Sequence, residues 1–147
     1  MTPAPAYPGN RLTDAIGGGV CQGSSTLYNC VLLADLEVVA RSCHGATVAY
    51  LPMGLDAAVN WGTTDFQFRN NFHFPVKIEA ETTEDLVKMR ILGTDEKDYY
   101  IKMTSSYDDS REDVIYAVSY KNKYSKATGE LISKNREAFS TYYRNIG

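Results

Sequence analysis

Residues 17–44 read GGGVCQGSSTLYNCVLLADLEVVARSCH, and this stretch decides the fold. Three glycines lead into Cys21, after which apolar residues recur with the spacing of an amphipathic helix over residues 22–34. Asp35 follows, a residue that tolerates the left-handed conformation of a helix end, and the β-branched valines that come next favour a strand. The sequence therefore predicts a buried central helix, a cap and a returning strand.

The lengths of these two elements decide whether Cys21 and His44 can meet. A helix of about 13 residues rises about 20 Å, and a strand of six or seven residues at about 3.3 Å each returns the same distance. A helix that instead continued to Arg41 would be about 30 Å long and would hold the two residues apart. We favour the reversal near Asp35, because helix, cap and strand is a common connection.

Cys21 is the candidate nucleophile, with the backbone around it as a candidate oxyanion hole. A cysteine at a helix N-terminus is stabilised as the thiolate by unpaired N–H groups and the helix dipole, and the thiolate is the reactive form. The backbone N–H groups of Gly19, Cys21 and Gln22 lie where the positive potential is greatest. The alternative is a small buried cysteine beside a glycine turn, which is common for free cysteine.

His44 is the candidate base for Cys21. An imidazole beside a thiol takes its proton and returns it to the leaving amine. Asp56, in the turn formed by residues 54–56, is the candidate for orienting that imidazole. The alternative for Asp56 is a turn residue that bonds its own backbone.

Five further residues are candidates for binding substrate, each with a plainer alternative. Arg41 suits a substrate carboxylate, or is a solvated charge at a strand end. Ser24 and Ser25 contact substrate, or cap the helix. Tyr28, seven residues after Cys21, lines the pocket, or fills the core. Trp61, the single tryptophan, stacks on a sugar or closes the cleft, or packs in the core.

Beyond residue 44 the chain reads mainly as strands, and no internal repeat is visible. Alternating apolar residues and turn signals place strands at residues 47–51, 57–61, 65–69, 75–80, 87–91, 99–104, 114–121 and 130–143. We therefore expect one α+β domain over residues 1–147, with a core over about 5–104 and a C-terminal β extension over about 111–143. In it the central helix packs on a mostly antiparallel sheet that ends in a C-terminal β-hairpin.

Composition excludes several classes of function. The chain has 147 residues, 44% of them hydrophobic, a net charge of −3 and a pI near 5.3, which gives no electrostatic footprint for nucleic acid. It lacks an apolar run of about 18 residues, so no membrane span is expected, and we identify no signal peptide or anchor. Cys21, Cys30 and Cys43 lack metal-site spacing, so we expect neither a metal nor a cofactor.

The motifs together resemble the VanW family over roughly residues 5–104, and the last strands resemble that family's usual C-terminal extension. The residues that carry the resemblance are 17–22 (GGGVCQ), 26–29 (TLYN), 32–34 (LLA), 36–39 (LEVV), 54–57 (GLDA), 65–66 (DF) and 68–71 (FRNN), with Ser24, Arg41, His44, Val48, Tyr50, Pro52, Val59 and Pro75. Many uncommon residues recur in one order and spacing, which makes the resemblance specific.

The resemblance implies an extracytoplasmic protein of the bacterial cell envelope, in a family named after a vancomycin-resistance cluster. Several members resemble L,D-transpeptidases that act on peptidoglycan stem peptides through a thioester on the cysteine of the glycine-rich motif, which is Cys21 here. The family often has glycine at the position of Asp35, which fits a helix end there. The alternative function is a non-catalytic module that binds the cell wall or a glycopeptide.

Overall fold

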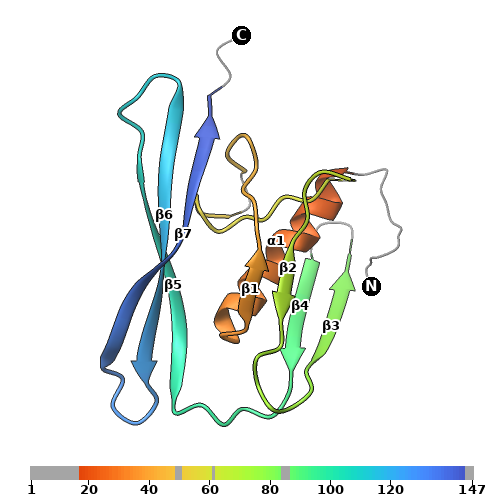
Figure 1. The fold of residues 1–147 in the computed structure, drawn as a ribbon, viewed down its shortest axis with the longest axis vertical. Coiled ribbons are helices and arrows are strands. Elements are labelled where there is room, and N and C mark those ends of the chain that lie inside the picture. The colour runs from red at the N-terminus through yellow and green to blue at the C-terminus, as the bar shows by residue number, and fades with distance from the viewer. Residues whose placement is uncertain (1–16, 49–50, 61, 84–86, 145–147) are drawn as a thin grey trace.

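The computed structural model describes residues 17–48, 51–60, 62–83 and 87–144, and side chains from Gln22 onward within them. The chain forms one helix and seven strands in these residues, with every strand pair antiparallel (Figure 1). In chain order these are α1 (Gly17–Leu33), β1 (Glu37–Ala40), β2 (Gln67–Arg69), β3 (Lys77–Thr82), β4 (Val87–Leu92), β5 (Tyr99–Asp108), β6 (Val114–Ser125) and β7 (Leu131–Tyr143).

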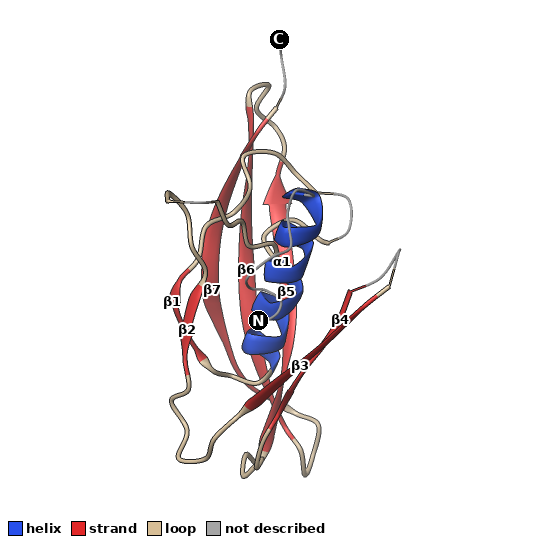
Figure 2. Ribbon diagram, turned by 90° about the vertical axis from the view of Figure 1, so that its right-hand side faces the viewer, coloured by secondary structure: helices blue, strands red, loops and turns tan. Residues whose placement is uncertain are grey.

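The predicted α+β class, with the helix packed on one sheet, is wrong. The fold is mainly β, and its strands form three separate sheets, β1–β2, β3–β4 and β5–β6–β7. We call the three-stranded sheet β5–β6–β7 the long sheet. α1 lies between the long sheet and the β3–β4 hairpin and contacts β1, β4 and β5, one strand from each sheet (Figure 2). Sequence periodicity identifies strands but not their partners, which is why it did not separate the sheets.

The segment between β1 and β2 is irregular where two strands were expected. Among its described residues only Asn60 and Thr64 form an isolated β-bridge. Leu55 and Ala57 are nevertheless buried, and they join Tyr28 and Leu32 of α1 in the core, packed against Val38, Phe66 and Met103. The apolar residues of this segment therefore pack in the core of the protein and do not belong to a sheet.

The chain reverses direction at Asp35, as the sequence predicts. Asp35 has φ of 59°, and the N–H groups of Asp35 and Leu36 donate to the carbonyls of Leu32 and Val31 at 3.1 and 3.0 Å, which is a Schellman end. The Asp35 carboxylate accepts hydrogen bonds from the Tyr99 hydroxyl (2.5 Å) and the Lys121 ammonium (2.8 Å). These bonds tie the end of α1 to the long sheet.

The helix begins earlier than predicted, at Gly17 rather than near Gln22. Glycine costs roughly 1 kcal/mol relative to alanine inside a helix, so the sequence favoured a turn. The structure nevertheless continues the helix through the three glycines. Cys21 is consequently the fifth residue of α1 and not its first. No helix in the described residues is both long and apolar enough to cross a membrane.

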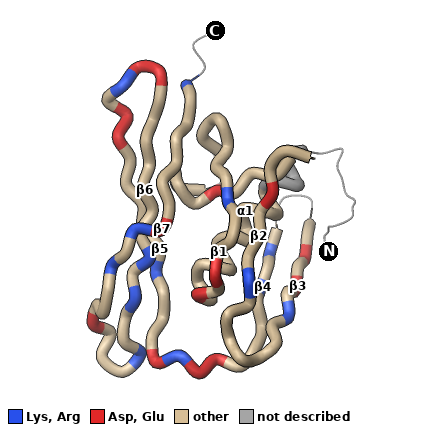
Figure 3. The backbone as a smooth tube through the Cα atoms, viewed as in Figure 1, with Lys and Arg blue, Asp and Glu red and all other residues tan. Residues whose placement is uncertain are grey.

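The expected C-terminal hairpin is part of a sheet of three long strands, because β5 pairs with β6 along its whole length and extends to Asp108, beyond the strand expected over residues 99–104. Its inner face buries Ile101, Ala117, Ser119, Ser140 and Tyr142. Its strands carry many lysine and arginine residues, whereas most acidic residues of this region lie in the connecting segments (Figure 3).

Candidate functional site

Asp56 lies at the centre of the candidate site. It follows a turn in which Gly54 has φ of +92° and the Leu55 N–H donates to the Pro52 carbonyl at 3.3 Å. The Asp56 side chain is 1% exposed. A buried carboxylate is stable only when hydrogen-bonded or paired, and so its partners identify what the site is built around.

His44 is the first partner of Asp56. The His44 Nδ1 lies 2.5 Å from Asp56 Oδ2, and the His44 backbone N–H donates to the same oxygen at 2.8 Å. A bond to a carboxylate places the imidazole proton on Nδ1, which leaves Nε2 as the acceptor nitrogen of the neutral ring. The His44 side chain is 19% exposed, so it is mostly covered but still reaches solvent.

Two further groups hold the other carboxylate oxygen. The Tyr142 hydroxyl donates to Asp56 Oδ1, and the Arg41 guanidinium lies 3.5 Å from it. Burial raises the pKa of Asp56, but the hydrogen bonds from Tyr142 and His44 and the charge of Arg41 outweigh burial and hold that pKa below its ordinary value. Asp56 is therefore an anion throughout the physiological pH range.

Arg41 is fully engaged within the protein. Its side chain is 6% exposed, and its guanidinium donates to the carbonyls of Asp56 (2.8 Å) and Gly54 (3.2 Å) and to Ser140 Oγ (2.8 Å). It also lies 5.1 Å from the ring centroid of Tyr28, which is wholly buried. The geometry makes Arg41 and Tyr28 supports of the turn that carries Asp56.

The serines after Cys21 bind the same segment from α1. Ser25 is buried, and it accepts a bond from the Ala57 N–H at 2.9 Å and donates to the Ala57 carbonyl at 3.1 Å. Ser24 donates to that carbonyl at 2.6 Å. Asn29 donates to the Leu55 carbonyl at 2.7 Å. This face of α1 therefore fixes the backbone on both sides of Asp56.

The remaining predicted residues are only partly described. Gly19, Cys21 and Gln22 lie in α1, but the Cys21 side chain is outside the described part of the structure, as is Trp61. The unpaired N–H groups of a helix belong to its first four residues. Gly19 lies in that turn, whereas Cys21 and Gln22 follow it.

Sequence reasoning missed Tyr142, Ser140 and Asn29. Tyr142 lies 86 positions from Asp56, and no local pattern connects the two. Asn29 has a weak signal, since a polar side chain on a buried helix needs a partner. A group of three or more histidine, cysteine or acidic side chains that could hold a metal does not occur among the described residues.

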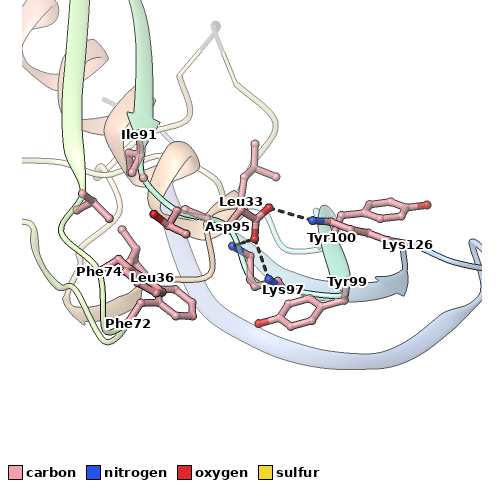
Figure 4. A pocket seen from close by; sticks show the side chains of 14 residues that line it. Leu33, Leu36, Phe72, Phe74, Ile91, Asp95, Lys97, Tyr99, Tyr100 and Lys126 are labelled. Atoms are coloured by element: carbon pink, nitrogen blue, oxygen red, sulfur yellow. Dashed lines mark hydrogen bonds and ion pairs between the residues drawn. The ribbon is translucent and has the colours of Figure 1, made fainter.

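A pocket of about 210 Å³ lies at the other end of α1 (Figure 4). Apolar side chains from the end of α1 and from the loop before β3 line it, and Asp95 accepts bonds there from Lys97 (2.8 Å) and Lys126 (2.9 Å). Leu33 in its wall is eight residues beyond Ser25, about 12 Å along the helix. None of the predicted site residues lines this pocket.

Comparison with known proteins places the chain in a family. A family model described as VanW like protein matches residues 2–92. The uncharacterized protein YoaR of Bacillus subtilis (strain 168) is 45% identical over 78 residues, which are 53% of this chain and 26% of that protein. The chain thus spans about a quarter of YoaR's length. No solved structure gives a significant match. Because the family model covers more than half of the sequence, the chain belongs to the VanW family.

Proposed function

We propose that this chain carries a cysteine-dependent acyl-transfer site for peptidoglycan stem peptides, with Cys21 as nucleophile and His44 as base. Membership of the VanW family suggests a cell-envelope protein, which is where such substrates occur. The observation that carries the proposal is the bond between His44 Nδ1 and Asp56 Oδ2 at 2.5 Å. It is the orienting half of a nucleophile, histidine and carboxylate triad.

The chemistry of the pair suits a general base. Asp56 is ionised and buried, so its charge stabilises the imidazolium that forms when His44 takes a proton. With the Nδ1 proton bonded to Asp56, Nε2 is the nitrogen available for proton transfer. A turn aspartate with a purely local role would bond its own backbone, whereas the carboxylate of Asp56 bonds two other side chains.

The register of α1 supports Cys21 as the third member. Residues four apart on a helix share a face and differ by about 6 Å along its axis. Position 21 is therefore one turn before Ser25, which bonds Ala57, the neighbour of Asp56. The helix that carries Cys21 thus runs directly beside the segment that carries the carboxylate.

The proposed reaction is a double displacement. The Cys21 thiol gives its proton to His44 Nε2, and its sulfur bonds the carbonyl carbon of the amide before a terminal D-residue. The carbon–nitrogen bond breaks, the leaving amine takes the proton from His44, and a thioester remains. An acceptor amine then attacks the thioester, loses its proton to His44 and displaces the sulfur, which recovers the proton as Cys21 is restored. Gly19, in the unpaired first turn, is the candidate donor to the oxyanion.

Incubation with tetrapeptide-stem muropeptides tests the proposal. We expect loss of a terminal D-alanine with a new crosslink, detected by mass spectrometry. Cys21→Ala should abolish the product and His44→Gln should reduce it at least about 100-fold. Cys30→Ala and Cys43→Ala are matched controls that should retain it.

Thiol alkylation by iodoacetamide separates the enzyme from the binding module. Burial raises the pKa of the Cys30 thiol, so Cys30 should react slowly. We expect Cys21 to react much faster than Cys30 and Cys43, and to lose that advantage in His44→Gln. Equal reactivity of the three thiols, together with no product, would refute acyl transfer and favour a non-catalytic module that binds the cell wall.

A further inference from the structure

The last strand of the chain forms one wall of the candidate site. Ser140 accepts from Arg41 Nη1 at 2.8 Å, Cys43 Sγ lies 3.4 Å from the Thr141 carbonyl, and the Tyr143 N–H donates to the Gly45 carbonyl at 2.6 Å. β7 therefore runs beside residues 41–45, the segment that delivers His44.

Tyr142 is the residue of β7 that reaches the carboxylate. Its side chain is buried, and its hydroxyl donates to Asp56 Oδ1 while it accepts from the Gly54 N–H at 2.7 Å. Burial, together with the bond to Asp56, raises the pKa of Tyr142 to about 12. The hydroxyl accordingly keeps its proton and remains a donor.

We propose that Tyr142 is a positioning residue for the His44–Asp56 pair, so that the site is completed by the C-terminal sheet. This inference rests on the proposed function, to which it adds a residue. Residue 142 lies outside residues 2–92, the part of the chain that the family model matches. On this inference the β5–β6–β7 sheet is part of the site, although it lies outside the residues that the family model matches.

The argument depends on how the two carboxylate oxygens are divided. Oδ2 receives both bonds from His44, whereas Oδ1 receives the bond from Tyr142 and lies 3.5 Å from the Arg41 guanidinium. Without the bond from Tyr142, Oδ1 keeps only the ion pair with Arg41, whose 3.5 Å separation holds the carboxylate less firmly against rotation about its Cβ–Cγ bond and so broadens the range of His44 orientations. The bond from Tyr142 removes that freedom and stabilises the anion at the same time.

The charged and titratable groups that face Asp56 come from three parts of the chain. One of these groups is Tyr28 of α1, whose own pKa is raised by burial and, to a smaller extent, by the charge of Asp56. Arg41 and His44 follow β1, and Tyr142 belongs to β7. Tyr142→Phe removes one hydrogen bond from Asp56 and leaves the contacts of His44 and Arg41 with the carboxylate in place.

Tyr142→Phe tests the inference by proton NMR of His44. The chain has 2 histidines, so His73→Gln assigns the signals. In the unmodified protein we expect a downfield Nδ1 proton that disappears when Asp56 is protonated. In Tyr142→Phe this signal should move upfield and exchange faster with water, and the pH at which it disappears should rise by about one unit.

Tyr143→Phe is the matched control, because Tyr143 is the next residue of β7 and is 63% exposed. It should leave the Nδ1 signal unchanged. If Tyr142→Phe gives the same spectrum and the same midpoint as Tyr143→Phe, Tyr142 does not position the pair and the inference is overturned.

A second variant covers the case in which Tyr142→Phe does not fold. Incorporating 3-fluorotyrosine at position 142 retains the ring and hydroxyl and makes the phenol a stronger donor. The midpoint for Asp56 should then shift downward, opposite to the shift in Tyr142→Phe. An unchanged or raised midpoint contradicts the inference.

The NMR readout also keeps the two proposals distinguishable. If Cys21 is unreactive and forms no product, acyl transfer fails, while a Tyr142-dependent His44 signal still establishes the positioning contact. If Cys21 is catalytic and the His44 signal ignores Tyr142, the function stands and this inference fails.

Discussion

A single buried carboxylate organises the candidate site. Removing Asp56 from water is unfavourable, and the bonds from His44 and Tyr142 together with the charge of Arg41 offset that cost. One of these partners, His44, is the proposed base, so the contacts that stabilise Asp56 also orient that base. The contacts that stabilise the buried Asp56 carboxylate therefore also serve the proposed chemistry of the site.

Asp56 should make the stability of the protein depend on acid pH. Because its pKa is lowered in the folded state, its contribution is complete above the unfolded value of about 3.9 and is lost as pH falls toward the folded value. Asp56→Asn should lower the free energy of unfolding by about 3 kcal/mol at pH 7 and flatten its decline below pH 4.

Urea denaturation at a series of pH values from 7 to 2 measures this effect. Asp109→Asn, which removes an exposed carboxylate, is the control and should leave the acid dependence as it is. An acid slope equal in Asp56→Asn and in the unmodified protein would show that Asp56 does not contribute to it.

The local sequence predicts some contacts of the candidate site, but it does not predict those made by residues far apart in the chain. The spacing from Cys21 to His44 predicts a reversal, and the structure places His44 against Asp56. The structure buries Tyr28, which is the plainer of its two alternatives. It also buries Arg41, which the sequence offered as a substrate ligand or as a solvated charge, because an arginine at a strand end is solvated unless distant chain covers it. Ser140 of β7 helps to cover the Arg41 guanidinium, and no residue near position 41 in the sequence predicts this contact.

At the scale of elements, the end of α1 at Asp35 reverses the chain and so determines the direction of β1. Asp35 occupies the left-handed position where glycine is the usual residue, and the bonds from Tyr99 and Lys121 compensate the backbone strain. Those bonds, with the charge of Lys121, also lower the pKa of Asp35 although burial acts in the opposite direction. The helix end is thus held by its own hydrogen bonds and by the long sheet.

Substitutions at Asp35 should separate these two contributions. Asp35→Ala keeps the strain and loses both side-chain bonds, and should lower the free energy of unfolding by about 3 kcal/mol. Asp35→Gly loses the bonds but removes the strain, and should be about 1 kcal/mol more stable than Asp35→Ala. Tyr99→Phe removes one bond without touching the backbone.

Chemical denaturation of the three variants at pH 7 compares them. Equal stabilities of Asp35→Ala and Asp35→Gly would mean that the left-handed conformation carries no strain at this position.

The elements differ in how well the sequence predicts them. The stop at Asp35 is confirmed, because the residue type, the helix length and the valines after it agree. The start is missed, since three glycines favour a turn locally while the structure continues the helix through them. The separation into three sheets is also missed, because pairing across long loops depends on tertiary packing.

At the scale of the whole molecule, the C-terminal sheet and the segment after β1 form one unit. Gly54 shows this connection, because its N–H bonds Tyr142, its carbonyl accepts from Arg41, and an added Cβ would face Ala117 at 3.6 Å. That distance is ordinary contact, so an alanine at position 54 is opposed by its positive φ and not by crowding.

Gly54→Ala and Gly129→Ala form a matched pair, because both glycines have positive φ, +92° and +74°. Each substitution should lower the free energy of unfolding by about 1–2 kcal/mol. Only Gly54→Ala should also disturb the His44 Nδ1 signal and the yield of crosslinked product, because no atom lies within 4 Å of a Cβ at Gly129 and that turn is remote from Asp56.

Thermal unfolding and the proton NMR of His44 are measured on both variants. A loss of the His44 signal in Gly129→Ala would show that general destabilisation, and not the turn at Gly54, disrupts the pair.

The contact between Tyr142 and Asp56 has a consequence for biosynthesis, since it joins residues 86 positions apart. A ribosome or a secretion channel releases the chain from its N-terminus, so the glycine-rich motif emerges long before the strand that secures the aspartate. During that interval His44 lacks the carboxylate that Tyr142 holds in place. Under the proposed function, Cys21 would therefore be activated only after β7 has emerged and packed against the segment that carries His44.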